Sequence, residues 1–464
     1  MKNYPRVMLA AGSSGSGKTM ITCGILQALK NRGLKVTSFK CGPDYIDPMF
    51  HEKVIHTRSG NLDTFFAGEE LTRYLFCKNA VDSDISVMEG VMGYYDGLGG
   101  FSVQASACDL AEVTNTPVIL VVNTRGMSLS VLAYIKGFLT FREPTRICGV
   151  ILNQLSPMLY PKMKEAIEKE LGIPVCGYVP RMEDCSLESR HLGLVLPQEV
   201  AQLSEKLQHI AEVLEDTLDL DQILEIGRKA GEVGSFEQAE KEMDQFFSLA
   251  AEERKGKPTL RIAVSKDEAF CFIYEANMQL LREMGVELIP FSPIHDTEIP
   301  AADGVLFYGG YPELFAKELS ENEKMRQDVK EKLAEGLPCM AECGGFMYLH
   351  QTMEDMEGNS WPMAGVIDGT AYRTKKLGRF GYIELERAEE PKEGCRLKGH
   401  EFHYFDSTSC GESYLAKKPL SSRSWRCIHE TETLMAGFPH LYYYASPEFI
   451  LKFLKKCRKY QETK

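Results

Sequence analysis

The sequence predicts an α/β protein whose first half is a doubly wound parallel sheet built around a P-loop. Residues 7–19 read VMLAAGSSGSGKT, an apolar run of strand length followed by the pattern G-x-x-x-x-G-K-T. A helix-prone segment follows over residues 20–30. Strand-like and helix-like segments then alternate up to residue 180, which is typical of a parallel sheet covered by helices.

The P-loop predicts a site for a nucleotide triphosphate. Gly12, Gly15 and Gly17 let the backbone turn tightly, so that several N–H groups face one phosphate at the start of a helix. Lys18 can reach the outer phosphates, and the Thr19 hydroxyl can bind Mg²⁺. The bland alternative is a chance glycine–serine loop, which the strand, loop and helix context disfavours.

Further strands and helices follow the P-loop in a regular order. Strand-like segments follow over 34–40, 84–89, 117–123, 147–153 and 174–180, and the continuous apolar run 117–123 is typical of a strand that is covered on both faces. Helix-like segments over 127–140 and 161–171 lie between them. We therefore expect the sheet to continue through residue 180.

Charged side chains stand where several of these strands end. Lys40 ends one strand and leads into a proline-bounded loop with Asp44 and Asp47, and Glu89 ends the next strand. Ligands of open α/β sheets gather at the carboxyl ends of the strands. We predict Mg²⁺ binding by Thr19, Asp47 and Glu89, and substrate binding by Lys40 and Asp44. The alternative for the two aspartates is a turn in which they bond the local backbone.

Two further residues complete the predicted site of the first half. Asp96 lies in the glycine-rich loop after Glu89, where it is a candidate for binding substrate or metal. Asn153 ends the strand 147–153 and is a candidate adenine contact in nucleotide binding.

Composition places a domain boundary near residue 257. Residues near 200–257 are polar, acidic and helix-prone, and the stretch RKGKP at 254–258 would break a helix. A new strand starts at 260, and the α/β pattern resumes. We predict a synthetase domain over 1–200, a helical connector over 201–257 and a second α/β domain over 258–464.

The second half carries the pattern of a cysteine nucleophile. Cys343 lies in AECGGF at a predicted strand-to-helix turn, which resembles a nucleophile elbow. The helix beyond it is expected to lower the pKa of the thiol. Gly309 and Gly310 end an earlier strand, and with Gly344 they could offer N–H groups to an oxyanion. A lone cysteine is more often a small buried hydrophobe, but this turn and the glycine pair favour the nucleophile.

A cysteine nucleophile needs a base, and four histidines are candidates. His350 is expected on the helix after Cys343, pointing away. His400 and His403 lie three apart on a predicted strand and so face opposite sides, which argues against a shared metal. His440 lies late in the chain, beside a presumed last strand.

Composition excludes several classes of protein. The net charge of −13 over 464 residues argues against nucleic-acid binding, and no apolar run is long enough to span a membrane. The fourteen cysteines lack the spacing of a disulfide framework or a zinc site. We therefore expect a cytoplasmic protein with reduced thiols.

At this point the motifs resemble a known family. The order of P-loop, KCGPDYIDP, EGVMGYYDG, GGYPE, AECGGFMYL and GHEFHY is similar to that of cobyrinate a,c-diamide synthases, glutamine-dependent amidotransferases of cobalamin biosynthesis. The resemblance covers nearly the whole chain. The P-loop half alone is also similar to dethiobiotin synthetase and to partition ATPases.

This resemblance implies a dethiobiotin-synthetase-like ATP-dependent domain and a class I glutamine amidotransferase domain without the usual third triad acid. It implies Cys343 as nucleophile and His440 as base, although the family's second histidine is replaced by Tyr442. Asp44, Ile46, Asp47, Glu89 and Asp96 match positions that bind or activate substrate and metal in the family.

The implied reaction joins two steps of chemistry. ATP would phosphorylate acetate carboxylates of cobyrinate, and ammonia released from L-glutamine at Cys343 would displace the phosphate. The stretch GHEFHY could line a passage for ammonia, or Glu401 and His403 could be only a structural pair. Hydrogenobyrinate or a nickel sirohydrochlorin are alternative substrates. A P-loop ATPase switch with a non-catalytic glutaminase-like domain is the alternative function, and a homodimer stays open.

Overall fold

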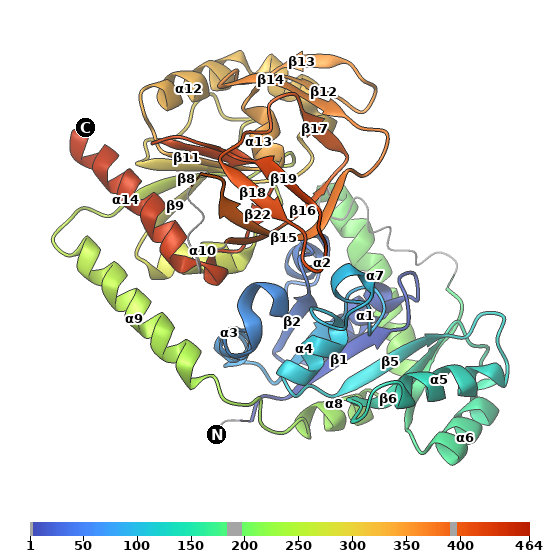
Figure 1. The fold of residues 1–464 in the computed structure, drawn as a ribbon. Coiled ribbons are helices and arrows are strands. Elements are labelled where there is room, and N and C mark those ends of the chain that lie inside the picture. The colour runs from blue at the N-terminus through green and yellow to red at the C-terminus, as the bar shows by residue number, and fades with distance from the viewer. Residues whose placement is uncertain (1–2, 183–196, 390–396) are drawn as a thin grey trace. The chain divides into compact units, whose positions relative to one another are not determined.

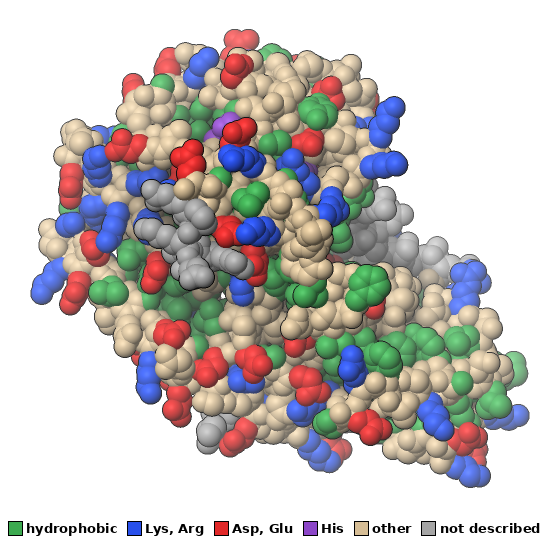
Figure 2. Space-filling model, viewed as in Figure 1, with side chains coloured by type: hydrophobic (Ala, Val, Ile, Leu, Met, Phe, Trp, Pro, Cys, Tyr) green, Lys and Arg blue, Asp and Glu red, His purple; other side chains and the backbone are tan. Residues whose placement is uncertain are grey.

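The computed structural model describes residues 3–182, 197–389 and 397–464, and it contains two compact units, Met1–Glu240 and Lys241–Lys464 (Figure 1). On the face in Figure 2, acidic and basic side chains are interspersed. No helix among the described residues is both long and apolar enough to cross a membrane.

The first unit is built on one seven-stranded sheet with the order β3-β2-β4-β1-β5-β6-β7. All of its strand pairs are parallel, which confirms the predicted fold class. Its strands are β1 (Arg6–Ala11), β2 (Val36–Cys41), β3 (Arg58–Leu62), β4 (Ile85–Glu89), β5 (Val118–Asn123), β6 (Ile147–Asn153) and β7 (Val175–Val179). The short polar strand β3 had no apolar run to predict it.

Helices cover both faces of this sheet. They are α1 (Lys18–Asn31), α2 (Ile46–Lys53), α3 (Thr64–Ala80), α4 (Ala107–Val113), α5 (Ser130–Thr140), α6 (Tyr160–Leu171), α7 (Pro197–Thr217) and α8 (Leu220–Arg228), with a 3₁₀ turn η1 at Leu98–Gly100. On one face, Val7 and Leu9 of β1 share a core with α1, α7 and α8. On the other face, Phe39 of β2 contacts Phe76 of α3, with ring centroids 5.4 Å apart.

The helices after residue 200 differ from the predicted connector. Leu207, Ile210 and Leu214 of α7 and Ile223 of α8 are buried in the core of the first unit. Their apolar positions follow helical spacing, so each helix hides one face against the sheet. The compact units accordingly divide between residues 240 and 241, within α9 (Glu237–Arg254), and not near 257.

The second unit contains a six-stranded sheet with the order β20-β21-β11-β10-β8-β9, parallel except for β20. Its strands are β8 (Arg261–Ser265), β9 (Glu287–Phe291), β10 (Gly304–Phe307), β11 (Cys339–Glu342), β20 (His429–Glu430) and β21 (Leu434–Gly437). Its remaining helical segments are α10 (Glu275–Glu283), η3 (Pro312–Phe315), α11 (Ala316–Glu321), α12 (Glu323–Ala334), α13 (Gly344–Tyr348), η4 (Tyr443–Ala445) and α14 (Pro447–Thr463).

Two smaller sheets complete the second unit, with the orders β13-β12-β14-β17 and β19-β18-β15-β16-β22. Their strands are β12 (His350–Glu354), β13 (Ser360–Pro362), β14 (Ile367–Arg373), β15 (Arg379–Arg387), β16 (Leu397–His403), β17 (Phe405–Ser407), β18 (Tyr414–Lys417), β19 (Ser424–Cys427) and β22 (His440–Leu441). Most pairs in these sheets are antiparallel, and β22 brings His440 opposite His400.

Candidate active sites of the two units

The P-loop joins β1 to α1 in the first unit. Gly15 and Gly17 have φ values of 76° and 90°, a region that strains residues with a side chain. Gly17 precedes α1, and no side chain caps that helix. The first N–H groups of α1 therefore point out of the helix without an internal partner, as a phosphate site requires.

Lys18 begins α1 and is held by backbone carbonyls. Its Nζ donates to the Met92 carbonyl at 2.5 Å and lies 3.5 Å from that of Ser13. Burial and the neighbouring Lys40 lower the pKa of Lys18, and Glu89 opposes this shift. A buried ammonium bonded only to neutral carbonyls can gain by pairing with an anionic phosphate.

Polar groups from the adjacent strands β2 and β4 and from α1 and α2 meet beside this lysine. The Thr19 hydroxyl donates to Glu89 Oε1 at 2.7 Å, and Lys40 Nζ lies 2.8 Å from the same oxygen. Lys40 also hydrogen-bonds Asp47 and lies 3.9 Å from Asp44 Oδ2. The sheet order β2-β4-β1 and the register that pairs Lys40 with Glu89 bring these groups together.

The charges in this cluster depend on one another. Burial alone would lower the pKa of Lys40, but Glu89, Asp47 and Asp44 raise it well above its usual value. Burial and Asp47 raise the pKa of Glu89 to about 7, against the effect of Lys40. Lys40 therefore stays charged and holds the carboxylates close together.

The donor set around Thr19 fits a small hard cation. The Thr19 hydroxyl and the Glu89 carboxylate are adjacent oxygen donors of the kind that Mg²⁺ prefers. Lys40 pairs with Asp47, so direct metal binding by Asp47 stays a prediction. The described residues contain no group of three or more His, Cys, Asp or Glu that could hold a metal by themselves. Such a site suits Mg²⁺, which commonly takes phosphate oxygens and water as its other ligands.

Other predicted residues of the first unit shape its loops. Asp44 Oδ1 accepts the Ile46 N–H at 2.9 Å and so supports the start of α2, which is the turn role that the sequence left open. Asp96 Oδ2 accepts the Gly93 N–H at 3.0 Å. Asn153 donates to the Ser16 carbonyl at 2.8 Å, so its amide braces the P-loop, and adenine contact stays a prediction.

His51 on α2 joins this cluster and was not predicted. Its Nε2 lies 3.9 Å from Glu89 Oε2, and its Nδ1 lies 3.1 Å from the Ser38 hydroxyl. Burial lowers the pKa of His51 to about 4, so the ring is neutral. The one sequence signal for His51 is that it follows Asp47 by four residues, which places both side chains on the same face of α2.

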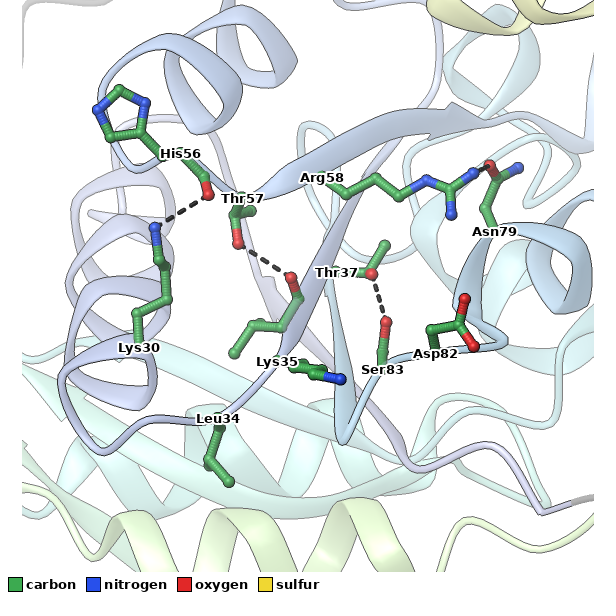
Figure 3. A pocket seen from close by; sticks show the side chains of 11 residues that line it. Lys30, Leu34, Lys35, Thr37, His56, Thr57, Arg58, Asn79, Asp82 and Ser83 are labelled. Atoms are coloured by element: carbon green, nitrogen blue, oxygen red, sulfur yellow. Dashed lines mark hydrogen bonds between the residues drawn. The ribbon is translucent and has the colours of Figure 1, made fainter.

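A separate pocket of about 360 Å³ lies at the amino ends of β2 and β3 (Figure 3). Two of its charged side chains are engaged: Lys30 donates to the His56 carbonyl at 2.9 Å, and Arg58 donates to Asn79 at 2.8 Å. Because the P-loop lies at the carboxyl ends of the strands, this pocket is distinct from the nucleotide site.

In the second unit, Cys343 follows β11 in a sharp turn. Its φ of 48° and ψ of −106° are unusual for a residue with a side chain, as in a nucleophile elbow. Its N–H donates to the Gly437 carbonyl at 2.8 Å, and it is 6% exposed. The expected drop in the pKa of this thiol is wrong: burial, with Glu313 and Glu401, raises it, and α13 is only five residues long. The thiol therefore needs a base to become a thiolate.

His440 is the histidine that lies beside Cys343. If Gly309 carried a Cβ atom, that atom would lie 3.3 Å from Cys343 Cβ and 3.3 Å from His440 Nε2. Both side chains therefore lie next to Gly309. The His400 ring stacks on that of His440, with centroids 4.9 Å apart and planes 17° apart. The Cε1–Nε2 edge of His440 thus lies on the side of Gly309 and Cys343, and His400 covers one face of the ring.

The other histidines are engaged elsewhere. His350 begins β12 and is not on the preceding helix as predicted, because α13 ends at Tyr348. Its Nδ1 lies 2.9 Å from the Phe346 carbonyl and its Nε2 2.6 Å from the Ser407 hydroxyl.

Glu401 and His403 form the buried pair that was one of the two readings of GHEFHY. His403 Nε2 lies 2.9 Å from Glu401 Oε2, and Trp425 donates to Glu401 Oε1 at 3.1 Å. The His403 ring stacks on Phe438, with centroids 4.0 Å apart. Trp425 was not predicted, because it comes from β19, far away in the sequence.

The glycine positions predicted for an oxyanion meet at the same place. A Cβ on Gly344 would lie 3.1 Å from the Gly310 nitrogen, so these two backbones are in close approach beside Cys343. The Gly309 carbonyl accepts the Phe272 N–H at 2.9 Å. The close approach of Gly310 and Gly344 favours their N–H groups as oxyanion donors, and a part for the Gly309 N–H stays a prediction.

Both units match known families. Residues 7–195 match the CobQ/CobB/MinD/ParA nucleotide binding domain, and residues 261–445 match the CobB/CobQ-like glutamine amidotransferase domain. Cobyrinate a,c-diamide synthase of Caldanaerobacter subterraneus subsp. tengcongensis is 40% identical over 460 residues, 97% of this chain and 98% of that protein. The cobyrinate a,c-diamide synthase of Listeria innocua is 40% identical over 96% of this chain and 98% of that protein. That of Dehalococcoides mccartyi is 36% identical over 98% of each chain.

The chain belongs to the cobyrinate a,c-diamide synthase family.

Membership in the cobyrinate a,c-diamide synthase family confirms the resemblance stated from the motifs. The chain combines a nucleotide-binding domain with a glutamine amidotransferase domain, as a glutamine-dependent ligase requires. A switch ATPase with a silent second domain is disfavoured, because Cys343, His440 and the glycine turns are present and adjacent.

In this member of the cobyrinate a,c-diamide synthase family, we predict that Gly309→Ala lowers the rate of glutamine hydrolysis by about 10²-fold or more, because small misplacements of reacting groups have effects of that size. The new Cβ would lie 2.4 Å from His440 Cε1, which forces the ring away from the thiol. Steady-state assays of glutamate release would measure this. Gly378→Ala is the matched control, since its Cβ would meet nothing within 4 Å. Wild-type hydrolysis by Gly309→Ala would show that His440 does not occupy this position.

Proposed function

We propose that this chain converts the a and c acetate carboxylates of cobyrinate into amides, using ATP and L-glutamine. The proposal is carried by one observation: a P-loop with an adjacent cluster of acids and a cysteine–histidine pair occur in one chain of this family.

The first unit activates the carboxylate. A carboxylate oxygen of the substrate attacks the γ-phosphorus of ATP, the bond to the β-phosphate oxygen breaks, and an acyl phosphate and ADP form. The N–H groups at the start of α1 and the Lys18 ammonium stabilise the negative charge on the phosphoryl group in transit. Thr19 and Glu89 would hold Mg²⁺, which neutralises phosphate charge when bound.

The second unit releases ammonia. His440 takes the proton from the Cys343 thiol, and the sulfur attacks the side-chain carbonyl of glutamine. The resulting oxyanion is stabilised by the N–H groups of Gly310 and Gly344. His440 then returns the proton to the leaving nitrogen, and water hydrolyses the thioester to glutamate. The ammonia attacks the acyl phosphate, and phosphate leaves as the amide forms.

Three finer assignments belong to this proposal. Mg²⁺ is proposed as the metal from the oxygen donors at Thr19 and Glu89. A cytoplasmic location is proposed because ATP and glutamine are available there, and because the cysteines among the described residues are free thiols. A homodimer remains a prediction from the sequence.

The function is tested by mass spectrometry of the products. The protein would be incubated with ATP, Mg²⁺ and glutamine and, in separate reactions, with cobyrinate, hydrogenobyrinate or a nickel sirohydrochlorin. We expect cobyrinate to give a diamide, with ADP and glutamate formed in equal amounts for each amide. ATP and glutamine consumption without any amide product would contradict the proposal, and a preference for another tetrapyrrole would replace cobyrinate as substrate.

A further inference from the structure

Glu342 is a buried acid that the reaction above does not use. It is the last residue of β11, directly before Cys343, and is 5% exposed. Neighbouring strands β10 and β21 lie on either side of β11 in the sheet. An ionisable side chain in such a strand is costly unless it has a partner or a task.

The carboxyl group of Glu342 lies beside the imidazole of His440. Glu342 Oε2 is 3.8 Å from His440 Nδ1, and both side chains are buried. The sheet explains this contact: Glu342 pairs with Gly437 at the end of β21, and the chain reaches His440 three residues later. The Leu441 N–H offers the same carboxyl group a hydrogen bond, which helps to keep it in place.

Cys343 and the carboxyl group of Glu342 lie near different nitrogens of one imidazole ring. Nε2 of His440 and Cβ of Cys343 would each lie 3.3 Å from a Cβ built on Gly309. Nδ1 of His440 lies 3.8 Å from Glu342 Oε2. This is the order of nucleophile, base and orienting acid that is found in catalytic triads on unrelated folds. The acid comes here from the residue before the nucleophile, and not from a position near the histidine in the sequence.

We propose that Glu342 is the positioning residue of His440: its carboxylate lies 3.8 Å from Nδ1 in this structure, and on closing that gap it accepts a hydrogen bond from Nδ1–H, so that the Nε2 lone pair is left for the Cys343 thiol. The inference rests on the proposed roles of Cys343 and His440 and adds a third member to that pair. No proton is gained or lost in this arrangement, because Glu342 only fixes the tautomer and stabilises the imidazolium that forms when the thiol is deprotonated.

Burial of the site explains why His440 needs an acidic partner. Burial lowers the pKa of His440, with His400 and His403 adding to the effect, so a lone imidazolium would be unfavourable there. Burial likewise raises the pKa of Glu342. A carboxylate and an imidazolium formed side by side stabilise each other, which neither group could achieve alone.

A second nearby acid is less suited to this role. Glu401 lies close enough to Cys343 to raise its pKa, but its two oxygens already accept from His403 and Trp425. Glu342 is therefore the better assignment from the contacts of the described residues.

The test compares Glu342→Gln, Glu342→Asp and the matched control Glu354→Gln. The native Glu354 carboxylate, on β12, accepts the N–H of Arg373 on β14. Glutamine hydrolysis would give kcat and KM, and amidation with ammonium salt would report the synthetase reaction. We expect Glu342→Gln to lower kcat by about 10²-fold or more with KM within about twofold, because the amide can trap the wrong tautomer. Glu342→Asp should recover part of kcat, and ammonia-dependent amidation should not change.

Three results would overturn the inference. They are a kcat of Glu342→Gln within about threefold of wild type, a rise in KM in place of the fall in kcat, and an equal fall in Glu354→Gln. If Glu342→Gln does not fold, Glu342→Asp decides, since a shortened acid should show lower kcat at unchanged KM. Cys343→Ala and His440→Ala separate the role of Glu342 from the proposed function. If these two variants still hydrolyse glutamine, the proposed function fails. If they are inactive and Glu342→Gln stays active, only the positioning role of Glu342 fails.

Discussion

Cys343→Ala should abolish glutamine-dependent amidation and leave ammonia-dependent amidation intact. Without the sulfur no thioester can form, so we expect the rate with glutamine to fall by about 10⁴-fold or more, the scale seen when a nucleophile is removed. The synthetase chemistry needs only ammonia and the acyl phosphate, and its residues lie in the first unit. Amide formation with either nitrogen source, measured on the same preparation, gives the comparison.

Cys339→Ala is the matched control for this experiment. Cys339 is the first residue of β11, the strand that Cys343 follows, and it is also buried. It should use glutamine at close to the wild-type rate. Glutamine use by Cys343→Ala above about a hundredth of the wild-type rate would mean that another group attacks glutamine.

Lys18→Ala should stop amidation with both nitrogen sources and leave glutamine hydrolysis. The Lys18 ammonium is the P-loop charge available to the outer phosphates, and it is now held only by the Met92 and Ser13 carbonyls. Loss of one preorganised charge at a phosphoryl-transfer site typically lowers the rate by about 10²–10³-fold, about 3–4 kcal/mol of transition-state stabilisation. The measurements are amide formation with ammonium salt and glutamate release without tetrapyrrole.

Lys30→Ala is the matched control in the same helix. Lys30 lies near the other end of α1, where its Nζ donates to the His56 carbonyl beside the pocket of Figure 3. It should keep near-wild-type amidation. The assignment of Lys18 is wrong if Lys18→Ala forms amide from ammonia at more than about a tenth of the wild-type rate.

Much of the fold followed from local patterns. Strand-like runs predicted β1, β2, β4, β5, β6 and β7 to within a few residues, and β1, β5 and β6 are largely apolar because strands covered on both faces need apolar side chains. The same logic failed for β3 and for most strands of the two smaller sheets of the second unit, although strands at His400 and beside His440 were expected. Their strands are short or half-exposed, so their patterns resemble those of loops.

The helices α7 and α8 show a different failure. Their polar composition suggested a connector, yet each hides one apolar face in the first core. Amphipathic spacing predicts that a helix packs somewhere, and only the folded chain determines where.

The sequence by itself determined the P-loop, the turn at Cys343 and the family, since each depends on residues that are neighbours in the chain. Tertiary structure decided that Lys40 joins Asp47 to Glu89, that His440 of the four histidines lies beside Cys343, and that Glu342 lies next to its ring. The physical reason is that strand order and register bring these side chains together across long sequence separations. Local patterns carry no record of that pairing.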